Sequence, residues 1–87
     1  MKASKFEKEL VAQGRLEGLL EGQLAARRSD ILAILEERFG KTVRATFEAR
    51  MNSIEDVDQL GRLLRLVGTG ASLDEFRAAL PPEVSRT

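Results

Sequence analysis

The sequence predicts an all-α fold, with one long N-terminal helix followed by three short helices. Strong helix-forming residues fill the chain from Ala3 to Phe39, without a proline or a cluster of turn residues. Glycines, prolines and capping patterns then divide the remainder into short segments. No stretch has the sustained two-residue alternation of a half-buried strand, so we expect no sheet.

The first segment is expected to be one helix of about 35 residues, about 50 Å long at 1.5 Å per residue. Gly40 follows Phe39 directly. Glycine suits the position after a helix C terminus, because it adopts a positive φ without a steric cost. We therefore expect the long helix to end before Gly40.

Two short helices are expected next, over about 42–51 and about 54–67. In the first, apolar residues recur every fourth position, at Val43, Phe47 and Met51. Ahead of the second, Ser53 and Asp56 form a capping-box pattern. Its apolar positions recur at three- and four-residue spacing, at Ile54, Val57, Leu60, Leu63, Leu64, Leu66 and Val67.

The third short helix is expected after the turn Gly68-Thr69-Gly70. Ser72 and Glu75 form a second capping-box pattern at its start. Pro81 and Pro82 should end it, and residues 81–87 are expected to form a flexible tail. Its inward positions are expected to be Leu73, Phe76 and Leu80.

The composition excludes several classes of function. The 87 residues include no cysteine and no histidine, which removes the usual zinc sites, thiol nucleophiles, Ser-His triads and disulfides. Fourteen basic residues balance 14 acidic ones, so no overall charge attracts nucleic acid or an anionic membrane. We therefore expect a protein that is not an enzyme and holds no cofactor or metal, with nucleic acid an improbable partner.

The sequence shows neither a secretory signal nor a membrane span. The first ten residues, MKASKFEKEL, lack the apolar run of a signal peptide. No window approaches the roughly 18 apolar residues that a membrane helix needs. These features predict a cytoplasmic protein with no membrane association.

The stretch GRLEGLLEGQL, residues 14–24, repeats with a period of four. Glycines recur every fourth residue, and leucines recur in the same period two residues later. Two residues are about 200° apart on a helix, so glycines and leucines take opposite faces. Three glycines inside a helix cost roughly 2.5–3 kcal/mol relative to alanine. Close approach of a second backbone would compensate for this cost, whereas a flexible linker is the alternative interpretation.

A helix this long projects beyond what the short helices can cover. We therefore divide the chain into a protruding oligomerisation helix at 1–26, a small helical domain at 27–80 and the tail at 81–87. The four-residue period favours a helix crossing near −50°. The predicted oligomer interface consists of Gly14, Gly18, Gly22, Leu16, Leu20, Leu24, Phe6 and Leu10.

Two charged clusters offer weaker alternatives. Glu55, Asp56 and Asp58 could hold Mg²⁺, but carboxylates in the first turn of a helix are more simply explained as caps. A DNA-binding accessory domain is the alternative function, with phosphates contacted by Arg27, Arg28 and Arg38.

The order of motifs resembles a known family. GRLEGLLEGQL, then LEERFG, then SIEDVDQLGRLLRLVGTGASLDEFRAAL look like the C-terminal helical region of bacterial Rpn-type, transposase-like nucleases of the PD-(D/E)xK class. The resemblance covers about residues 14–80. It implies an accessory helical module, because the nuclease domain lies upstream in the family and its strand-borne Asp and Glu-x-Lys motif are absent here.

We therefore predict a non-catalytic protein–protein association module. It is expected to form a homo-oligomer, and the resemblance adds a homologous full-length nuclease as a second partner that the chain would assemble with or modulate. The number of chains and their relative direction are left open at this point.

Overall fold

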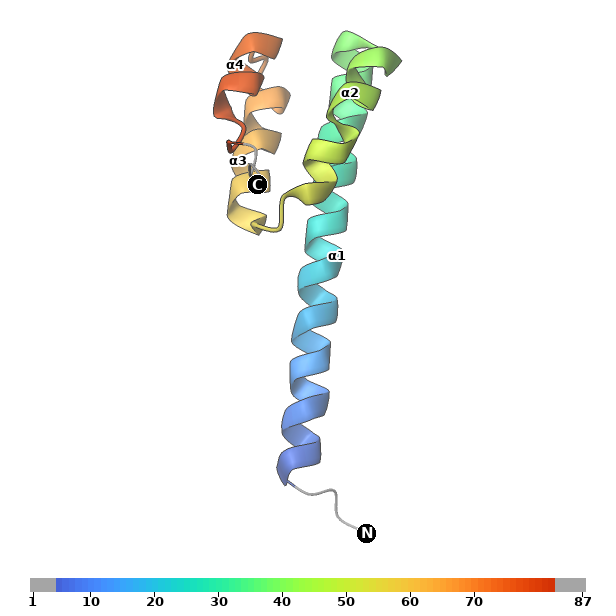
Figure 1. Ribbon diagram of the computed structural model, residues 1–87, viewed down its shortest axis with the longest axis vertical. Coiled ribbons are helices and arrows are strands. Elements are labelled where there is room, and N and C mark those ends of the chain that lie inside the picture. The colour runs from blue at the N-terminus through green and yellow to red at the C-terminus, as the bar shows by residue number, and fades with distance from the viewer. Residues whose placement is uncertain (1–4, 83–87) are drawn as a thin grey trace, which may run out of the picture.

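The computed structural model describes the chain over residues 5–82, with side chains from Gly14 onward. This range contains four helices and no strand: α1 (Lys5–Phe39), α2 (Lys41–Ser53), α3 (Val57–Gly68) and α4 (Leu73–Ala79). The predicted all-α class, with one long and three short helices, is confirmed. Figure 1 shows α2, α3 and α4 gathered around one end of α1, while the other end extends away from them.

Gly40 produces the reversal between α1 and α2. Its φ is 101°, a conformation that disfavours any residue with a Cβ. Its amide donates to the carbonyl of Glu36 at 2.9 Å, which closes the last turn of α1. The chain therefore turns back at once, and α2 packs along the end of α1 that it has just left (Figure 1).

The boundary between α2 and α3 differs from the prediction. Ser53 belongs to α2, and its hydroxyl donates to the Arg50 carbonyl rather than capping the next helix. Asp56 is the N-cap of α3, and its Oδ1 accepts from the amides of Asp58 and Gln59 at 3.0 and 3.2 Å. Ile54 lies between the helices in an extended conformation. The predicted capping box was wrong because Asp56 itself reaches the free amides.

The link from α3 to α4 matches its sequence pattern. Gly70 has a φ of 92°, and the Ala71 amide donates to the Leu66 carbonyl, as in a Schellman motif. The Ser72 hydroxyl accepts from the Glu75 amide at 3.1 Å, and the Glu75 carboxylate accepts from the Ser72 amide at 3.2 Å. The predicted second capping box is confirmed.

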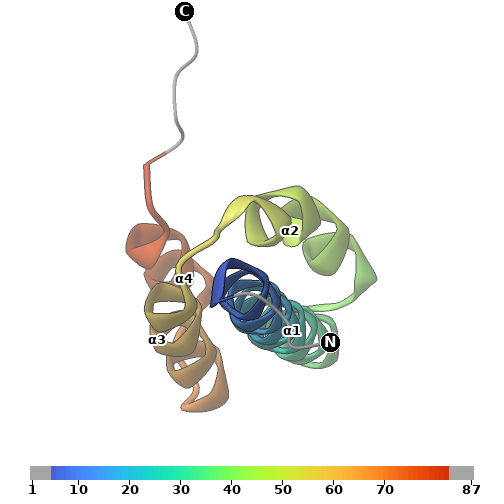
Figure 2. The ribbon, with the colours of Figure 1, turned by 90° about the horizontal axis from the view of Figure 1, so that it is seen from below.

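The core joins all four helices. In Figure 2, α1 is seen nearly end-on, with α2 along one part of its circumference and α3 along another, while α4 packs on α3. Phe47 of α2 meets Phe76 of α4 edge to face, with ring centroids 5.3 Å apart. The buried apolar side chains are Leu24, Ile31, Leu32, Leu35, Phe47, Met51, Ile54, Leu60, Leu63, Val67 and Phe76.

Leu24, one of the predicted oligomer-interface residues, lies in the core instead. Its side chain is only 2% exposed and packs with the other buried apolar residues of the chain. The helices packed on α1 reach this level, so Leu24 already has its apolar contacts within the chain.

At the C-terminal end of the described range, the Pro81 carbonyl accepts a hydrogen bond from the Arg50 guanidinium at 2.5 Å. Residues 83–87 of the predicted tail lie outside the described residues.

Candidate functional site

The segment of α1 from Gly14 to Gln23 is exposed at every position. It carries three large apolar side chains that remain in solvent, with 67% of Leu16, 61% of Leu19 and 45% of Leu20 exposed. We call these three residues the exposed leucine row. In Figure 1 this part of α1 extends beyond the other helices, which explains why none of them covers the row. An apolar group of this kind usually marks a binding surface.

Leu19 is the residue of this row that the predicted interface omitted. Leu16 and Leu20 follow the four-residue period, and Leu19 does not. It lies about 60° from Leu16 around the helix, so it widens the same apolar side. A search for apolar neighbours three residues apart, rather than four, would have found it.

The glycines of this segment take no part in packing within the chain. A Cβ added at Gly14, Gly18 or Gly22 would have no atom within 4 Å among those that could obstruct it. The predicted close approach of a second backbone therefore has no counterpart inside a single chain. Phe6 and Leu10, the remaining predicted interface residues, lie in α1, but their side chains fall outside the described part of the structure.

Two of the three arginines expected to contact phosphate have acceptors inside the chain. Arg28 donates to the carbonyl of Ile54, through Nε at 3.2 Å and Nη2 at 2.6 Å. Arg38 donates through Nη1 to the carbonyl of Val67 at 2.9 Å. These carbonyls lie just after α2 and near the end of α3, where helices have unpaired acceptors. Both arginines therefore attach a shorter helix to α1.

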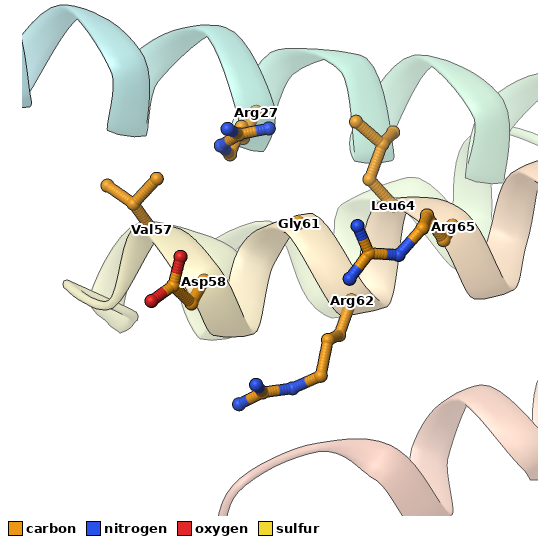
Figure 3. Close-up of a pocket in the computed structure, with 7 residues that line it drawn as sticks. All are labelled: Arg27, Val57, Asp58, Gly61, Arg62, Leu64 and Arg65. Carbon is orange, nitrogen blue, oxygen red and sulfur yellow. The ribbon is translucent and has the colours of Figure 1, made fainter.

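Arg27 is different from its neighbour Arg28. It lies beside a shallow cavity of about 320 Å³ between α1 and α3 (Figure 3). Its Nε is buried and has no hydrogen-bond partner. Arg62 and Arg65 also line the cavity, but Figure 3 shows Arg62 pointing away from Arg27, so the three guanidinium groups do not converge on one point.

The acidic residues at the start of α3 do not form a metal site among the described residues. Asp56 caps α3, as the simpler interpretation of the acidic cluster expected, and no group of three metal-ligating side chains occurs within the described range. Within that range, no helix combines the length and apolar character that crossing a membrane would require.

The geometry therefore leaves the exposed leucine row as the main candidate surface. Comparison of the chain with protein-family models, with curated proteins and with solved structures gives no match in any of the three.

Proposed function

We propose that this chain is a non-catalytic association module that binds another copy of itself through the exposed leucine row. The observation that carries the proposal is a contrast within one helix: the large apolar side chains beyond Leu24 are buried or partly buried, while Leu16, Leu19 and Leu20 are exposed. Burying a leucine side chain contributes roughly 1.5–3 kcal/mol. Association is the direct way to gain that free energy for a row that the chain itself leaves in water.

Mass measurement by light scattering and sedimentation tests the proposal. The natural chain should have at least twice the mass of one chain at high concentration and should dissociate on dilution. The double variant Leu16→Gln/Leu20→Gln should be a monomer with unchanged helical content, because these side chains make no contact in the core.

A matched control uses the same new side chains elsewhere on α1. Ala25 and Ser29 are exposed, and both lie away from the leucine row around the helix. The double variant Ala25→Gln/Ser29→Gln should therefore assemble like the natural chain. If the leucine variant keeps the natural mass, or the control loses it, the row is not the association surface.

The resemblance to Rpn-type nucleases supports a second partner for the same row. A homologous full-length nuclease with a corresponding helix would present a similar surface, so this chain would enter mixed assemblies by mass action and modulate the enzyme. Co-expression with a tagged full-length relative should give co-purification and altered DNA cleavage. The Leu16→Gln/Leu20→Gln variant should give neither. If the natural chain does not co-purify with the nuclease, the nuclease proposal is wrong, whereas the proposal of self-association is unaffected.

A further inference from the structure

Leu16 and Leu20 of the exposed leucine row lie on the side of α1 that α3 occupies further along. Eighteen residues make about five complete turns of a helix, so Leu20 lies in line with Arg38. Arg38 donates to the Val67 carbonyl of α3 at 2.9 Å. Arg27, about two turns after Leu20, lies against Gly61 of α3, with its Nη1 3.8 Å from where a glycine Cβ would stand. From the level of Arg27 onward, α3 therefore fills this side of α1.

This position restricts the direction in which a second copy can bind. In a parallel pair with matching registers, the second α1 would continue past Leu24 along the same side. There it would meet the volume that α3 occupies, and its own α3 would do the same in return. In an antiparallel pair centred near Gly18, the second copy places its short helices at the opposite end, and only the first turns of its α1 reach the level of α3. The fold therefore favours an antiparallel contact on this face.

The sequence of the exposed segment fits an antiparallel contact. Residues 13–23 read QGRLEGLLEGQ, in which seven of the eleven positions are the same in both directions about Gly18. In an antiparallel two-fold pair centred there, positions equally far from Gly18 come to the same level. Identical residues then meet at three levels, Gln13 with Gln23, Gly14 with Gly22, and Leu16 with Leu20, while Arg15 shares a level with Glu21 and Glu17 shares one with Leu19. The glutamine and leucine levels are the ones on the contact side of the helix.

We propose that two copies pair antiparallel through their α1 helices, with a two-fold axis at the level of Gly18 and with Leu16 of each copy packed on Leu20 of the other. This inference rests on the proposed self-association and adds its geometry. The four-residue leucine spacing favours a crossing near −50°, which directs the first turns of the second α1 sideways past α3. The contact is therefore short, confined to about residues 13–23, and the dimer dissociates readily.

The two-fold axis also brings one pair of like charges together. Glu17 is one residue from the axis and about 80° around the helix from the middle of the leucine pair. In the antiparallel pair, Glu17 of both copies falls on the same edge of the contact. In a parallel pair the two fall on opposite edges. Glu21 is about 120° from the middle of the leucine pair and faces away from the contact.

A charge substitution therefore separates the two directions. Glu17→Gln should tighten the dimer about twofold, the size expected for removal of one exposed repulsion. Glu21→Gln is the matched control and should leave the dissociation constant unchanged. No gain for Glu17→Gln, or an equal gain for the control, would contradict the antiparallel geometry.

Distances between spin labels provide the decisive measurement. The chain has no cysteine, so Ser29→Cys and Ala33→Cys each introduce a single labelling site at an exposed position of α1. In the antiparallel dimer the label separation should be about 30 Å from position 29 and about 40 Å from position 33, given 1.5 Å per residue on each helix and a crossing near −50°. A parallel dimer would give about 20 Å from both.

The outcomes distinguish this inference from the proposed function. Separations near 20 Å from both positions would overturn the antiparallel geometry while self-association stood. Absence of a dipolar interaction at concentrations where dimer is expected would contradict self-association itself. Gly18→Leu adds a third test, because Gly18 lies opposite the leucine row. The dimer should survive this substitution, and its loss would move the contact to the glycine face and overturn the inference.

Discussion

The two parts of α1 on either side of Leu24 are one continuous helix with very different surroundings. Beyond Leu24, Ile31 and Leu35 are completely buried, and arginines donate to carbonyls of neighbouring helices. Before Leu24, leucines of the same period are about half to two-thirds exposed. The comparison teaches that apolar periodicity predicts which face of a helix is apolar. How far the neighbouring helices extend along that face determines which part of it becomes core.

The largest difference between the two parts is expected for leucine truncation. Leu35→Ala should lower the free energy of unfolding by about 3 kcal/mol, because it removes fully buried methyl groups and leaves a cavity. Leu16→Ala should change it by less than about 0.5 kcal/mol under dilute, monomeric conditions. Urea unfolding followed by circular dichroism measures both. Equal losses for the two variants would show that the exposed segment is covered within one chain.

A smaller difference is expected for the adjacent arginines. Arg28→Met should lower the free energy of unfolding by about 1–2 kcal/mol, since the Ile54 carbonyl loses its charged donor. Arg27→Met should be neutral or slightly stabilising, because the buried Nε of Arg27 has no acceptor to lose. Thermal unfolding of both variants compares them directly. A larger loss for Arg27→Met would mean that its guanidinium has a structural partner.

The smallest expected effect concerns the glycines of the exposed segment. Gly18→Ala should stabilise α1 by about 0.8–1 kcal/mol of helix propensity, and the new Cβ meets open space. Gly70→Ala, in the turn after α3, should instead destabilise the protein by about 1 kcal/mol, because the positive φ of Gly70 disfavours a side chain. Helical content and unfolding midpoints measure the opposite signs. Destabilisation by Gly18→Ala would indicate that the exposed segment is not helical in solution.

Much of the fold followed from local patterns in the sequence. Gly40, the second capping box at Ser72 and the long run of helix-forming residues each act over a few neighbours, so their effects were predictable. The cap of α3 was misplaced, because both Ser53 and Asp56 are good capping residues and local pattern alone did not choose between them.

Long-range contacts were less predictable. Leu24 has the same spacing as Leu16 and Leu20, and its burial depends on how far the packed short helices extend along α1. The acceptors of Arg28 and Arg38 lie in segments more than 25 residues away along the chain, which no local pattern encodes. The candidate surface was therefore predicted in its general place, while its boundary with the core needed the structure.

Because α1 is uninterrupted through Leu24, its number of residues fixes the direction in which the exposed leucine row faces relative to α3. One residue inserted after Gly22 would rotate the exposed leucine row by about 100° relative to α3 and shift it by about 1.5 Å. Seven inserted residues would shift the row by about 10 Å but return it to within about 20° of its original direction. The length of α1 between Leu20 and Leu24 thus determines which way the row faces. Insertions that preserve the facing direction of the row should therefore be tolerated far better than single-residue ones.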